Sequence, residues 1–457
     1  MLSTPKLADE LKGHVIEPND PDYERARTVF YGTVDRRPAA IVKVADATDV
    51  ARVIAYAREG GLELAVRSGG HSVAGHGVTD GGIVLDLSDM RALEIDAERR
   101  TAWAETGLTA GEYTYAAARH GLATGFGDTG SVGIGGITLG GGVGFLVRKH
   151  GLTIDDLLAA EVVTADGELL YADAESHPDL FWAIRGGGGN FGVATRFKFR
   201  LHPVDGFVGG IIFLPATPDV IASFVAQAHA APEELSTIAN VMAAPPLPFV
   251  PPEVHGKLVV MGMVAYAGDV EDGERAIAPF RALATPIADM IRPMSYPEMY
   301  PPEEEEYRPV AVARTMFVDG VDRAAAGTIL DHIRASSAMM AVTQIRVLGG
   351  AVARVPADAT AYAHRGSRIM VNVAALYQLP AERPAHEAWV KGLAGELLQD
   401  DHGAYVGFLA DEGEERVRAA YPGPTWDRLR QVKRRYDPDN LFALNQNIPP
   451  AGEDDQR

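Results

Sequence analysis

The first 200 residues of the chain alternate short apolar runs with amphipathic stretches. The run AAIVKV precedes DATDVARVIAYAREGG, in which Asp46 stands at an N-cap position and glycines follow the last turn. The apolar positions of this stretch recur at helical spacing: Val50, Val53, Ile54 and Ala57. LELAVR then resumes as a strand. The order is therefore β-α-β, which predicts parallel strands covered by a helix.

Strand and helix signals continue to about residue 205. GGIVLDL is typical of a strand, and LTAGEYTYAAARHG of a capped helix that ends at Gly121. LAAEVVTADGELLYA predicts a hairpin that turns at Asp166 and Gly167. VATRFKFRL alternates with period two and therefore predicts another strand.

The pattern changes after Pro203. Residues 206 to about 415 carry less glycine and more proline, and alternation such as KLVVMGMVAYAG mixes with helical segments such as GERAIAPFRAL. This region is interpreted as a separate α+β domain, and its acidic run at 303–306 as a solvated loop. The tail then begins with a helix that ends before Asp437 and the following proline. One face of that helix is apolar: Trp426, Leu429, Val432 and Tyr436.

Composition narrows the function classes. The 457 residues suit two or three domains, and the absence of cysteine excludes disulfides, thiolate zinc sites, iron–sulfur clusters and a cysteine nucleophile. A net charge of −20 disfavours a nucleic-acid or anionic-membrane partner. Because no run of eighteen apolar residues and no export signal is seen, we expect a cytoplasmic protein without a membrane partner. The sequence does not indicate an oligomeric state.

Glycine is concentrated in two segments. RSGGHS follows an apolar run, and eleven glycines lie between Gly125 and Gly151. Such density predicts backbone pressed against a ligand or, alternatively, tight packing between strands. Successive N–H groups of a glycine turn can hold phosphate without a helix end. Two such loops, some sixty residues apart, could hold the two ends of one extended cofactor.

A third glycine group imitates a nucleotide-binding motif. Gly187, Gly189 and Gly192 satisfy G-x-G-x-x-G. That motif requires a helix after it, so that the helix N-terminus can hold a pyrophosphate. Here a strand pattern follows, and we therefore reject the dinucleotide-binding interpretation.

Five motifs in order resemble a known superfamily. These are VRSGGHS, GGIVLDL, TGSVGIGGITLGGGVGFLVRKHG, PDLFWAIRGGGGNFGVATRFKF and YDPDNLFALNQNIPP. Together they resemble the FAD-linked oxidases of the vanillyl-alcohol oxidase superfamily, in particular the branch of berberine bridge enzyme and 6-hydroxy-D-nicotine oxidase. The resemblance covers roughly residues 35–205 and 420–450. It implies FAD as the cofactor.

The resemblance also implies a role for the histidine of the first turn. The family's histidine at the position of His71 is bonded covalently to the 8α-methyl of the flavin, and a neutral imidazole nitrogen suits that attack. A non-bonded histidine and a metal site with His76 and Asp80 are the alternatives. No metal is expected, because flexible glycine turns do not preset ligand geometry. The residues carried over as cofactor contacts are Arg67, Ser68, Gly69, Gly70, His71, Ser72, Thr129, Gly130, Gly133, Gly136, Ile137, Thr138, Gly141, Gly144, Gly192, Val193, Asn445 and Asn447.

Two of these positions depart from the family pattern. Many relatives form a second flavin bond through a cysteine where this chain has Thr129, so a single attachment through His71 is expected. Relatives often carry histidine where this chain has Ile137. Something else must then stabilise the reduced flavin, such as backbone N–H groups or an arginine.

The position of the family's catalytic base also differs in this chain. Relatives with a catalytic tyrosine place it at the end of Y-x-N-Y, and the corresponding stretch here is YVGF, which ends in Phe408. Tyr405 could serve as a base, as could a water held by Arg346 or Gln344. In the tail, Asn445 and Asn447 come just after a predicted helix and suit hydrogen bonds to flavin or loops. Their alternative role is to pin the C-terminal segment.

These observations predict an α+β protein with a two-part FAD-binding domain of the vanillyl-alcohol oxidase type, at 1–205 and 420–457. A substrate domain with an antiparallel sheet flanked by helices would occupy 206–419. The expected function is a covalent flavoprotein oxidase that removes a hydride from an alcohol or amine carbon of a small molecule and reduces O2 to H2O2. A dehydrogenase with another electron acceptor and a flavin-bound protein without turnover remain alternatives.

Overall fold

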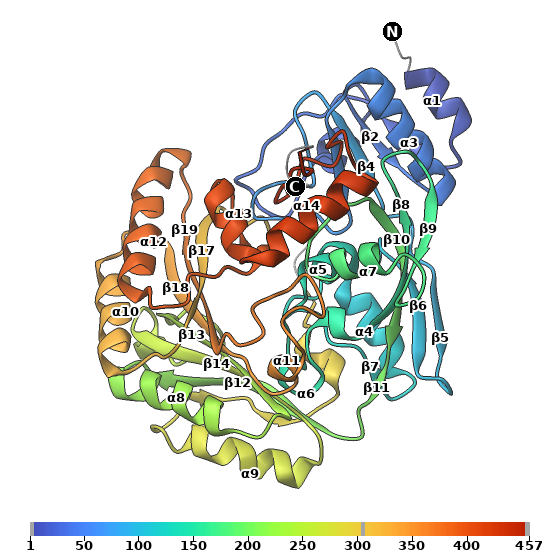
Figure 1. The fold of residues 1–457 in the computed structure, drawn as a ribbon. Helices are drawn as coiled ribbons and strands as arrows, with labels where there is room; N and C mark the ends of the chain where they lie inside the picture. Colours follow the sequence, from blue (N-terminus) through green and yellow to red (C-terminus); the bar gives the residue numbers. More distant parts are fainter. Residues whose placement is uncertain (1–3, 303–306, 453–457) are drawn as a thin grey trace.

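The computed structural model describes residues 4–302 and 307–452, so the acidic run at 303–306 lies outside the described residues. The fold has two parts (Figure 1). One part is built on two small sheets and a two-stranded pair, β7 (Leu122–Ala123) with β11 (His202–Pro203). The other is built on one large antiparallel sheet with helices on one side. The predicted α+β fold is confirmed.

The first small sheet contains the predicted β-α-β unit. Its strands, in spatial order, are β1 (His14–Ile16), β2 (Ala40–Lys43), β4 (Ile83–Asp86) and β3 (Leu64–Arg67). β2 and β3 each pair in parallel with β4, so the two strands of the unit are separated by a third. Helix α3 (Ala47–Gly60) begins at Asp46, whose side chain accepts from two backbone amides of the first turn.

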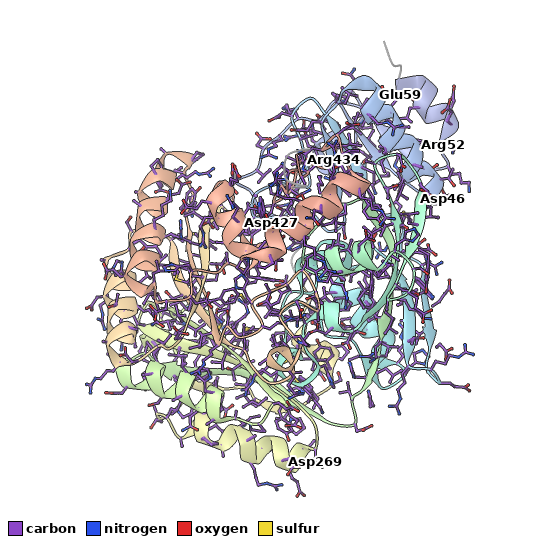
Figure 2. The ribbon with its side chains drawn as sticks, in the orientation of Figure 1. Asp46, Arg52, Glu59, Asp269, Asp427 and Arg434 are labelled. Atoms are coloured by element: carbon purple, nitrogen blue, oxygen red, sulfur yellow. The ribbon has the colours of Figure 1, made fainter. Side chains whose placement is uncertain are left out.

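Helix α3 is amphipathic in the way the sequence predicts. Val53 and Ile54 are fully buried in the core below it. Its charged residues Arg52 and Glu59 lie on the outer side (Figure 2). The burial of one apolar face therefore positions the helix, and with it the start of the first glycine turn after β3.

The second small sheet is antiparallel. Its strands, in spatial order, are β5 (Leu93–Asp96), β6 (Thr101–Glu105), β10 (Val193–Arg200), β8 (Leu157–Val163) and β9 (Leu169–Ala172). β10 is the central strand, which confirms that a strand and not a helix follows the G-x-G-x-x-G glycines. The β8–β9 pairing confirms the predicted hairpin, and Gly167 takes a positive φ of 87° in its turn. Helix α4 (Ala110–Ala118) begins with a capping box formed by Thr109 and Glu112.

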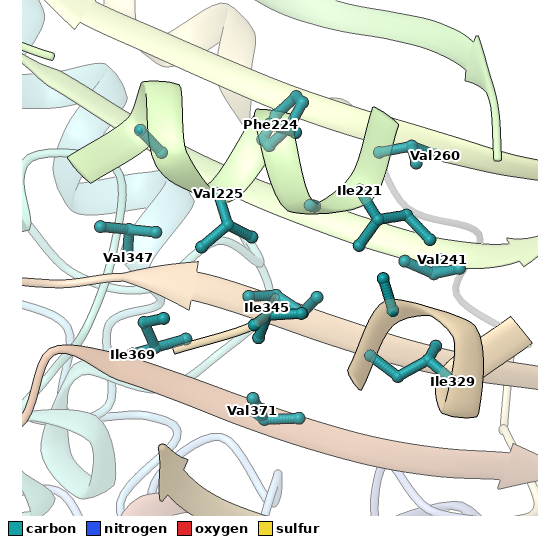
Figure 3. Close-up of a cluster of buried hydrophobic side chains, with 14 of the residues drawn as sticks. Ile221, Phe224, Val225, Val241, Val260, Ile329, Ile345, Val347, Ile369 and Val371 are labelled. Atoms are coloured by element: carbon teal, nitrogen blue, oxygen red, sulfur yellow. The ribbon is translucent and has the colours of Figure 1, made fainter. Parts of the chain in front are cut away.

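The large sheet forms the core of the second part. Its strands, in spatial order, are β15 (Ala288–Asp289), β12 (Phe207–Pro215), β14 (Leu258–Ala267), β13 (Leu235–Ala243), β18 (Met340–Val347), β19 (Ile369–Leu376) and β17 (Ala311–Val318), with β16 (Arg292–Pro293) also on β12. Four helices pack on one face: α8 (Pro218–Ala230), α9 (Val270–Arg281), α10 (Arg323–Ala335) and α12 (Arg383–Leu397). Their apolar side chains interdigitate with those of the strands, as Phe224, Ile329 and Ile345 show (Figure 3).

The two parts are joined by hydrogen bonds as well as by the chain that passes between them. After the second glycine segment, α6 (Val147–His150) reaches the large-sheet part. The buried Arg148 guanidinium donates to the carbonyls of Ala228, Ala231 and Leu235. The adjacent Lys149 ammonium donates to the carbonyl of Ala267 at 2.6 Å.

The tail returns to the first part. Helices α13 (Glu414–Ala420) and α14 (Pro424–Tyr436) lie across it (Figure 1), and α14 ends before Asp437 as predicted. The apolar face of α14 shares a core with Phe197, whereas Asp427 and Arg434 point outward (Figure 2). Ala404 and Leu409 already belong to that core. The limits 1–205, 206–419 and 420–457 stay a prediction.

Within the described ranges, every helix is too short or too polar to cross a bilayer.

Candidate cofactor and substrate site

A cavity of ≈ 350 Å³ lies where segments far apart in the sequence meet. Its walls come from the glycine turn after β3, the second glycine segment, the residues before β10, and the end of the chain. Residues 405–409 line it from the segment that follows the large sheet. The cavity therefore forms only when both ends of the chain and its middle have folded together.

The two glycine segments touch backbone to backbone. A Cβ added to Gly69 would lie 2.2 Å from the backbone nitrogen of Gly133, and one added to Gly133 would lie 2.2 Å from that of Gly69. Ser68 strengthens the contact, because its hydroxyl donates to the carbonyl of Thr106 at 2.6 Å and accepts from the Gly135 amide at 3.3 Å. Glycine is required here by close approach.

The second segment differs from the prediction of a glycine turn. Gly133 is an N-cap, and Ile134–Gly140 form helix α5. Glycine is a poor helix former, but packing against the first turn overrides that preference. A Cβ on Gly136 would meet nothing within 4 Å, and Gly136 lines the cavity. The helix thus presents bare backbone to the space where a ligand would lie.

His71 lies in the cavity wall between the two segments. Its Nε2 is 3.0 Å from the hydroxyl of Ser131. Its ring stacks on Phe30 with the centroids 4.0 Å apart and the planes at 21°. These two contacts fix the plane of the imidazole at the edge of the cavity.

The metal alternative would need His71, His76 and Asp80 to meet at one point. His76 lines the cavity, and burial lowers its pKa to about 4, so its ring is neutral at pH 7. Asp80 accepts instead from the backbone amide of Arg37 at 2.7 Å. In residues 4–302 and 307–452, no three histidine or acidic side chains gather closely enough to hold a metal ion.

The tail is fixed by a buried ion pair. The Lys433 ammonium and the Asp437 carboxylate are both fully buried and 2.6 Å apart. Lys433 also donates to the carbonyl of Asn190, and Asp437 accepts from the backbone amides of Leu441 and Phe442. These bonds hold the tail against the residues that precede β10.

Asn445 and Asn447 are placed differently from expectation. Helix α14 ends at Tyr436, so neither asparagine follows it directly; both lie in an irregular segment. Asn445 lines the cavity, and its Nδ2 donates to the carbonyl of Phe442 at 2.8 Å. The buried Oδ1 atoms of both asparagines have no hydrogen-bond partner among the described residues. The Asn445 amide oxygen is thus a buried acceptor beside the cavity.

The other predicted cofactor contacts divide into two groups. Those that line the cavity are Arg67, Ser68, Gly69, Gly70, His71, Ser72, Thr129, Gly133, Gly136, Ile137, Gly192, Val193 and Asn445. Those that do not line it are Gly130, Thr138, Gly141, Gly144 and Asn447.

The second group has structural reasons for its residue types. A Cβ on Gly144 would lie 1.9 Å from the carbonyl oxygen of Phe126. Gly141 has a φ of 128°, which favours glycine, and packs on Tyr405. The Gly130 carbonyl accepts from Gly111, and the Thr138 side chain is buried. These residues shape the second glycine segment from behind.

The lining residues fit FAD. The cradle is glycine backbone that side chains would fill, which suits a diphosphate held by N–H groups. Leu64, Leu87 and Phe442 provide apolar surface for a flat ring, and Asn445 offers its unpartnered acceptor. His71 stands where a flavin edge would meet the protein. A two-ended cofactor with a charged middle matches this arrangement.

Tyr405 is poorly suited to act as a base. It is buried in the cavity wall, and its hydroxyl accepts from the Gly142 amide at 3.0 Å. Burial raises its pKa to about 12, so the phenol is protonated at neutral pH. Phe408 also lines the cavity and carries no titratable group.

Arg346 and Gln344 lie behind the cavity and not in its wall. Both are on β18, and the Arg346 guanidinium is buried, bonded to the side chains of Asp128 and Gln344. Gln344 in turn donates to Asn240 at 2.9 Å. A water base held by Arg346 or Gln344 stays a prediction.

Tyr31 and Asp128 are among the lining residues that were not identified from the sequence pattern. Tyr31 lies beside Phe30, and burial raises its pKa to about 12. Asp128 lines the cavity next to Thr129, within the second glycine segment. A charged residue inside a glycine-rich ligand loop is the signal that could have identified Asp128.

Comparison with known proteins identifies the family of the chain. A family model described as an FAD binding domain matches residues 38–173, and one described as berberine and berberine like matches 404–449. The chain is 33% identical to (R)-6-hydroxynicotine oxidase of Paenarthrobacter nicotinovorans, over 98% of this chain and 99% of that protein. It is 29% identical to the xylooligosaccharide oxidase of Thermothelomyces thermophilus, over 95% of this chain and 91% of that protein.

A solved structure has the same fold over its full length. The crystal structure of 6-hydroxy-D-nicotine oxidase from Arthrobacter nicotinovorans superimposes with a TM-score of 0.87 at 28% identity, covering 99% of this chain and 100% of that one. Fold, cavity and relatives define an FAD-dependent oxidoreductase. The chain belongs to the berberine bridge enzyme-like family of FAD-linked oxidoreductases, which confirms the resemblance found in the sequence.

Proposed function

We propose that this protein is a covalent flavoprotein oxidase. Its FAD is attached through His71, and it removes a hydride from an alcohol or amine carbon of a small organic substrate and reduces O2 to H2O2. The observation that carries the proposal is His71, held in the cavity wall by Phe30 and Ser131 between two glycine segments. Thr129 offers no thiol for a second bond, so the attachment is single.

The bound flavin supplies the hydride acceptor, and the protein supplies position and environment. The backbone amides around Gly69 and Gly133 would hold the diphosphate, and the apolar side chains of Val143 and Phe408 would exclude water beside the reacting carbon. The Asn445 amide oxygen, which has no partner among the described residues, would accept a hydrogen bond from the cofactor.

An amine is the substrate class favoured by these residues. Tyr405 is held protonated, and Phe408 replaces a phenol, so no tyrosinate assists proton removal. A neutral amine needs little such help, because its nitrogen lone pair drives hydride departure. The relative named as an oxidase of (R)-6-hydroxynicotine supports this choice.

The attachment is tested by acid precipitation of the purified protein. We expect the flavin to remain with the pellet, and the His71→Ala variant to release it into the supernatant. Flavin released wholly by the unaltered protein would contradict covalent attachment.

The reaction is tested by screening alcohols, amines and sugars with peroxide detection. Stoichiometric peroxide with one substrate class is the expected result. Anaerobic reduction followed by air separates an oxidase, which reoxidises quickly, from a dehydrogenase, which does not. Lack of turnover with every class would favour a flavin-bound protein without catalysis.

A further inference from the structure

An ion pair at the cavity joins the two parts of the molecule. Asp128, in the second glycine segment, forms an ion pair with Arg346 of β18 in the large sheet. The Arg346 side chain is 4% exposed, and that of Asp128 is 19% exposed and lines the cavity. The carboxylate is therefore presented to the cavity, whereas the guanidinium supports it from behind.

Only one oxygen of the Asp128 carboxylate forms a short hydrogen bond within the protein. Asp128 Oδ2 accepts from Arg346, while the contact to Oδ1 from the hydroxyl of Thr129 is long, at 3.5 Å. Such a distance is at the limit of a hydrogen bond. Oδ1 can therefore accept a hydrogen from a ligand without loss of the Arg346 contact.

The other titratable groups of the wall are poor proton acceptors. Tyr31 and Tyr405 have pKa values raised to about 12 by burial and are protonated at neutral pH. His76 is neutral but buried, and a charge on it is disfavoured, since burial lowers its pKa to about 4. Among the described residues that line the cavity, Asp128 is the only carboxylate.

Arg346 is fixed by further contacts on the sheet. Its second terminal nitrogen donates to Gln344, which donates to Asn240 on the neighbouring strand β13. The guanidinium carbon also lies 4.9 Å from the centroid of the Phe408 ring. The large sheet thus sets the orientation of a carboxylate that belongs to the flavin-binding part.

We propose that Asp128 is a catalytic carboxylate of the oxidation and that Arg346 is its positioning residue. The inference rests on the proposed function. As the substrate C–H bond breaks, its electron pair would leave with the hydrogen as a hydride, for which bound FAD would supply the acceptor. The O–H or N–H electrons form the new C=O or C=N bond, and that proton passes to Asp128 Oδ1. Before the transfer, the carboxylate stabilises the positive charge that develops on the substrate.

The charge pair can be tested without turnover by titrating the holoenzyme with sulfite, which adds to the oxidised flavin as an anion and bleaches it. Asp128→Asn removes a negative charge and should tighten sulfite binding about tenfold, whereas Arg346→Gln leaves the carboxylate uncompensated and should weaken it about tenfold. Shifts in the same direction, or none, would overturn the proposal.

Turnover supplies the second measurement, once the substrate screen has yielded a substrate. Asp128→Asn should lower kcat by about 10²-fold, the low end of the range for loss of a general base, because a neutral amine needs little help with proton removal but loses the carboxylate that stabilises its developing positive charge. The change in KM should be smaller. Asp128→Glu should restore part of the rate. A kcat within threefold of the unaltered enzyme in Asp128→Asn would refute the catalytic role.

A control variant and a second variant make the sulfite titration interpretable. Asp155→Asn is the matched control, because Asp155 also forms an ion pair, with Arg365, but does not line the cavity. It should leave sulfite affinity unchanged. If Asp128→Asn does not retain flavin, Arg346→Gln alone decides, since unchanged sulfite affinity in it would refute the charge pair. The sulfite result also stands apart from the proposed function, because it needs no substrate.

Discussion

The flavin-binding part and the large-sheet part contribute to the cavity by different means. The first presents backbone: Gly69, Gly133 and Gly136 bring bare amides to the cavity. The second supports the cavity from behind with side chains on neighbouring strands, as Asn240, Gln344 and Arg346 do. Backbone recognition fixes the cofactor for a whole family, whereas side chains on a sheet can be exchanged without altering the fold. The two regions should therefore respond oppositely to substitution.

The largest effect is expected at the contact between the glycine segments. Gly69→Ala would place a Cβ 2.2 Å from the Gly133 nitrogen, so the segments must separate and flavin loading should be lost. The flavin-to-protein absorbance ratio measures this. Gly327→Ala on α10 is the control, because its Cβ meets nothing within 4 Å, and it should load flavin normally. Full loading of Gly69→Ala would show that the contact is not needed.

A smaller effect on the same part is expected from the tail. Lys433→Met leaves the Asp437 carboxylate buried and unpaired, which should lower the free energy of unfolding by about 3–5 kcal/mol. Flavin retention should fall with it, since these residues hold Asn190 and Phe442 at the cavity. Arg435→Met is the control: its exposed pair with Asp179 should contribute about 0–1 kcal/mol. Equal effects of the two variants in thermal and urea unfolding would contradict the assignment.

The large-sheet part should lose stability without losing the cofactor site. Phe224 is buried between α8 and the sheet, and Phe224→Ala should cost about 3–5 kcal/mol. Protein that remains folded should keep its flavin, because Phe224 does not line the cavity. The comparison is Phe249→Ala at a 38% exposed position, where a change within about 0.5 kcal/mol is expected. Loss of flavin from folded Phe224→Ala protein would mean that the two parts are not separable in this way.

The smallest effect is expected at Tyr405. Burial favours the neutral phenol and raises its pKa to about 12, so Tyr405 ionises only above that pH and contributes no titration between pH 6 and 10. Tyr405→Phe should retain most activity, with an unchanged pH profile in that range. A rate loss of three or more orders of magnitude, with loss of the alkaline limb, would identify Tyr405 as the base after all.

The contrast between the two parts also explains which features could be predicted from the sequence. The α3 cap at Asp46, the β8–β9 hairpin and strand β10 follow from local pattern, and the structure confirms them. The helical state of residues 134–140 could not be predicted, because glycine-rich sequence has no helical preference and packing against the first turn decides. The turn containing His71 was recognisable because its glycines are required by contacts at fixed positions.

The side-chain site was less accessible to prediction. Arg346 and Gln344 were identified as polar residues near the substrate, but their partners Asp128 and Asn240 lie 218 and 104 residues away in sequence. Pairing of that kind depends on strand order in the large sheet, which no local pattern encodes. The position of Asn445 likewise depends on the buried Lys433–Asp437 pair.

The bonds of Arg148 and Lys149 to the large-sheet part bear on how a substrate can enter. A domain attached to another at one point can rotate in any direction, and a domain attached at two points can still rotate about the line through those points. Here the chain crosses between the parts before Phe207 and again before Ala404, and α6 adds a support at Ala228, Ala231, Leu235 and Ala267. The ion pairs Asp128–Arg346 and Asp155–Arg365 join the two parts as well. With supports at this many points, rocking of one part against the other is restrained. We therefore expect substrate to arrive by movement of loops and side chains at the cavity rim, with the two parts remaining fixed to each other.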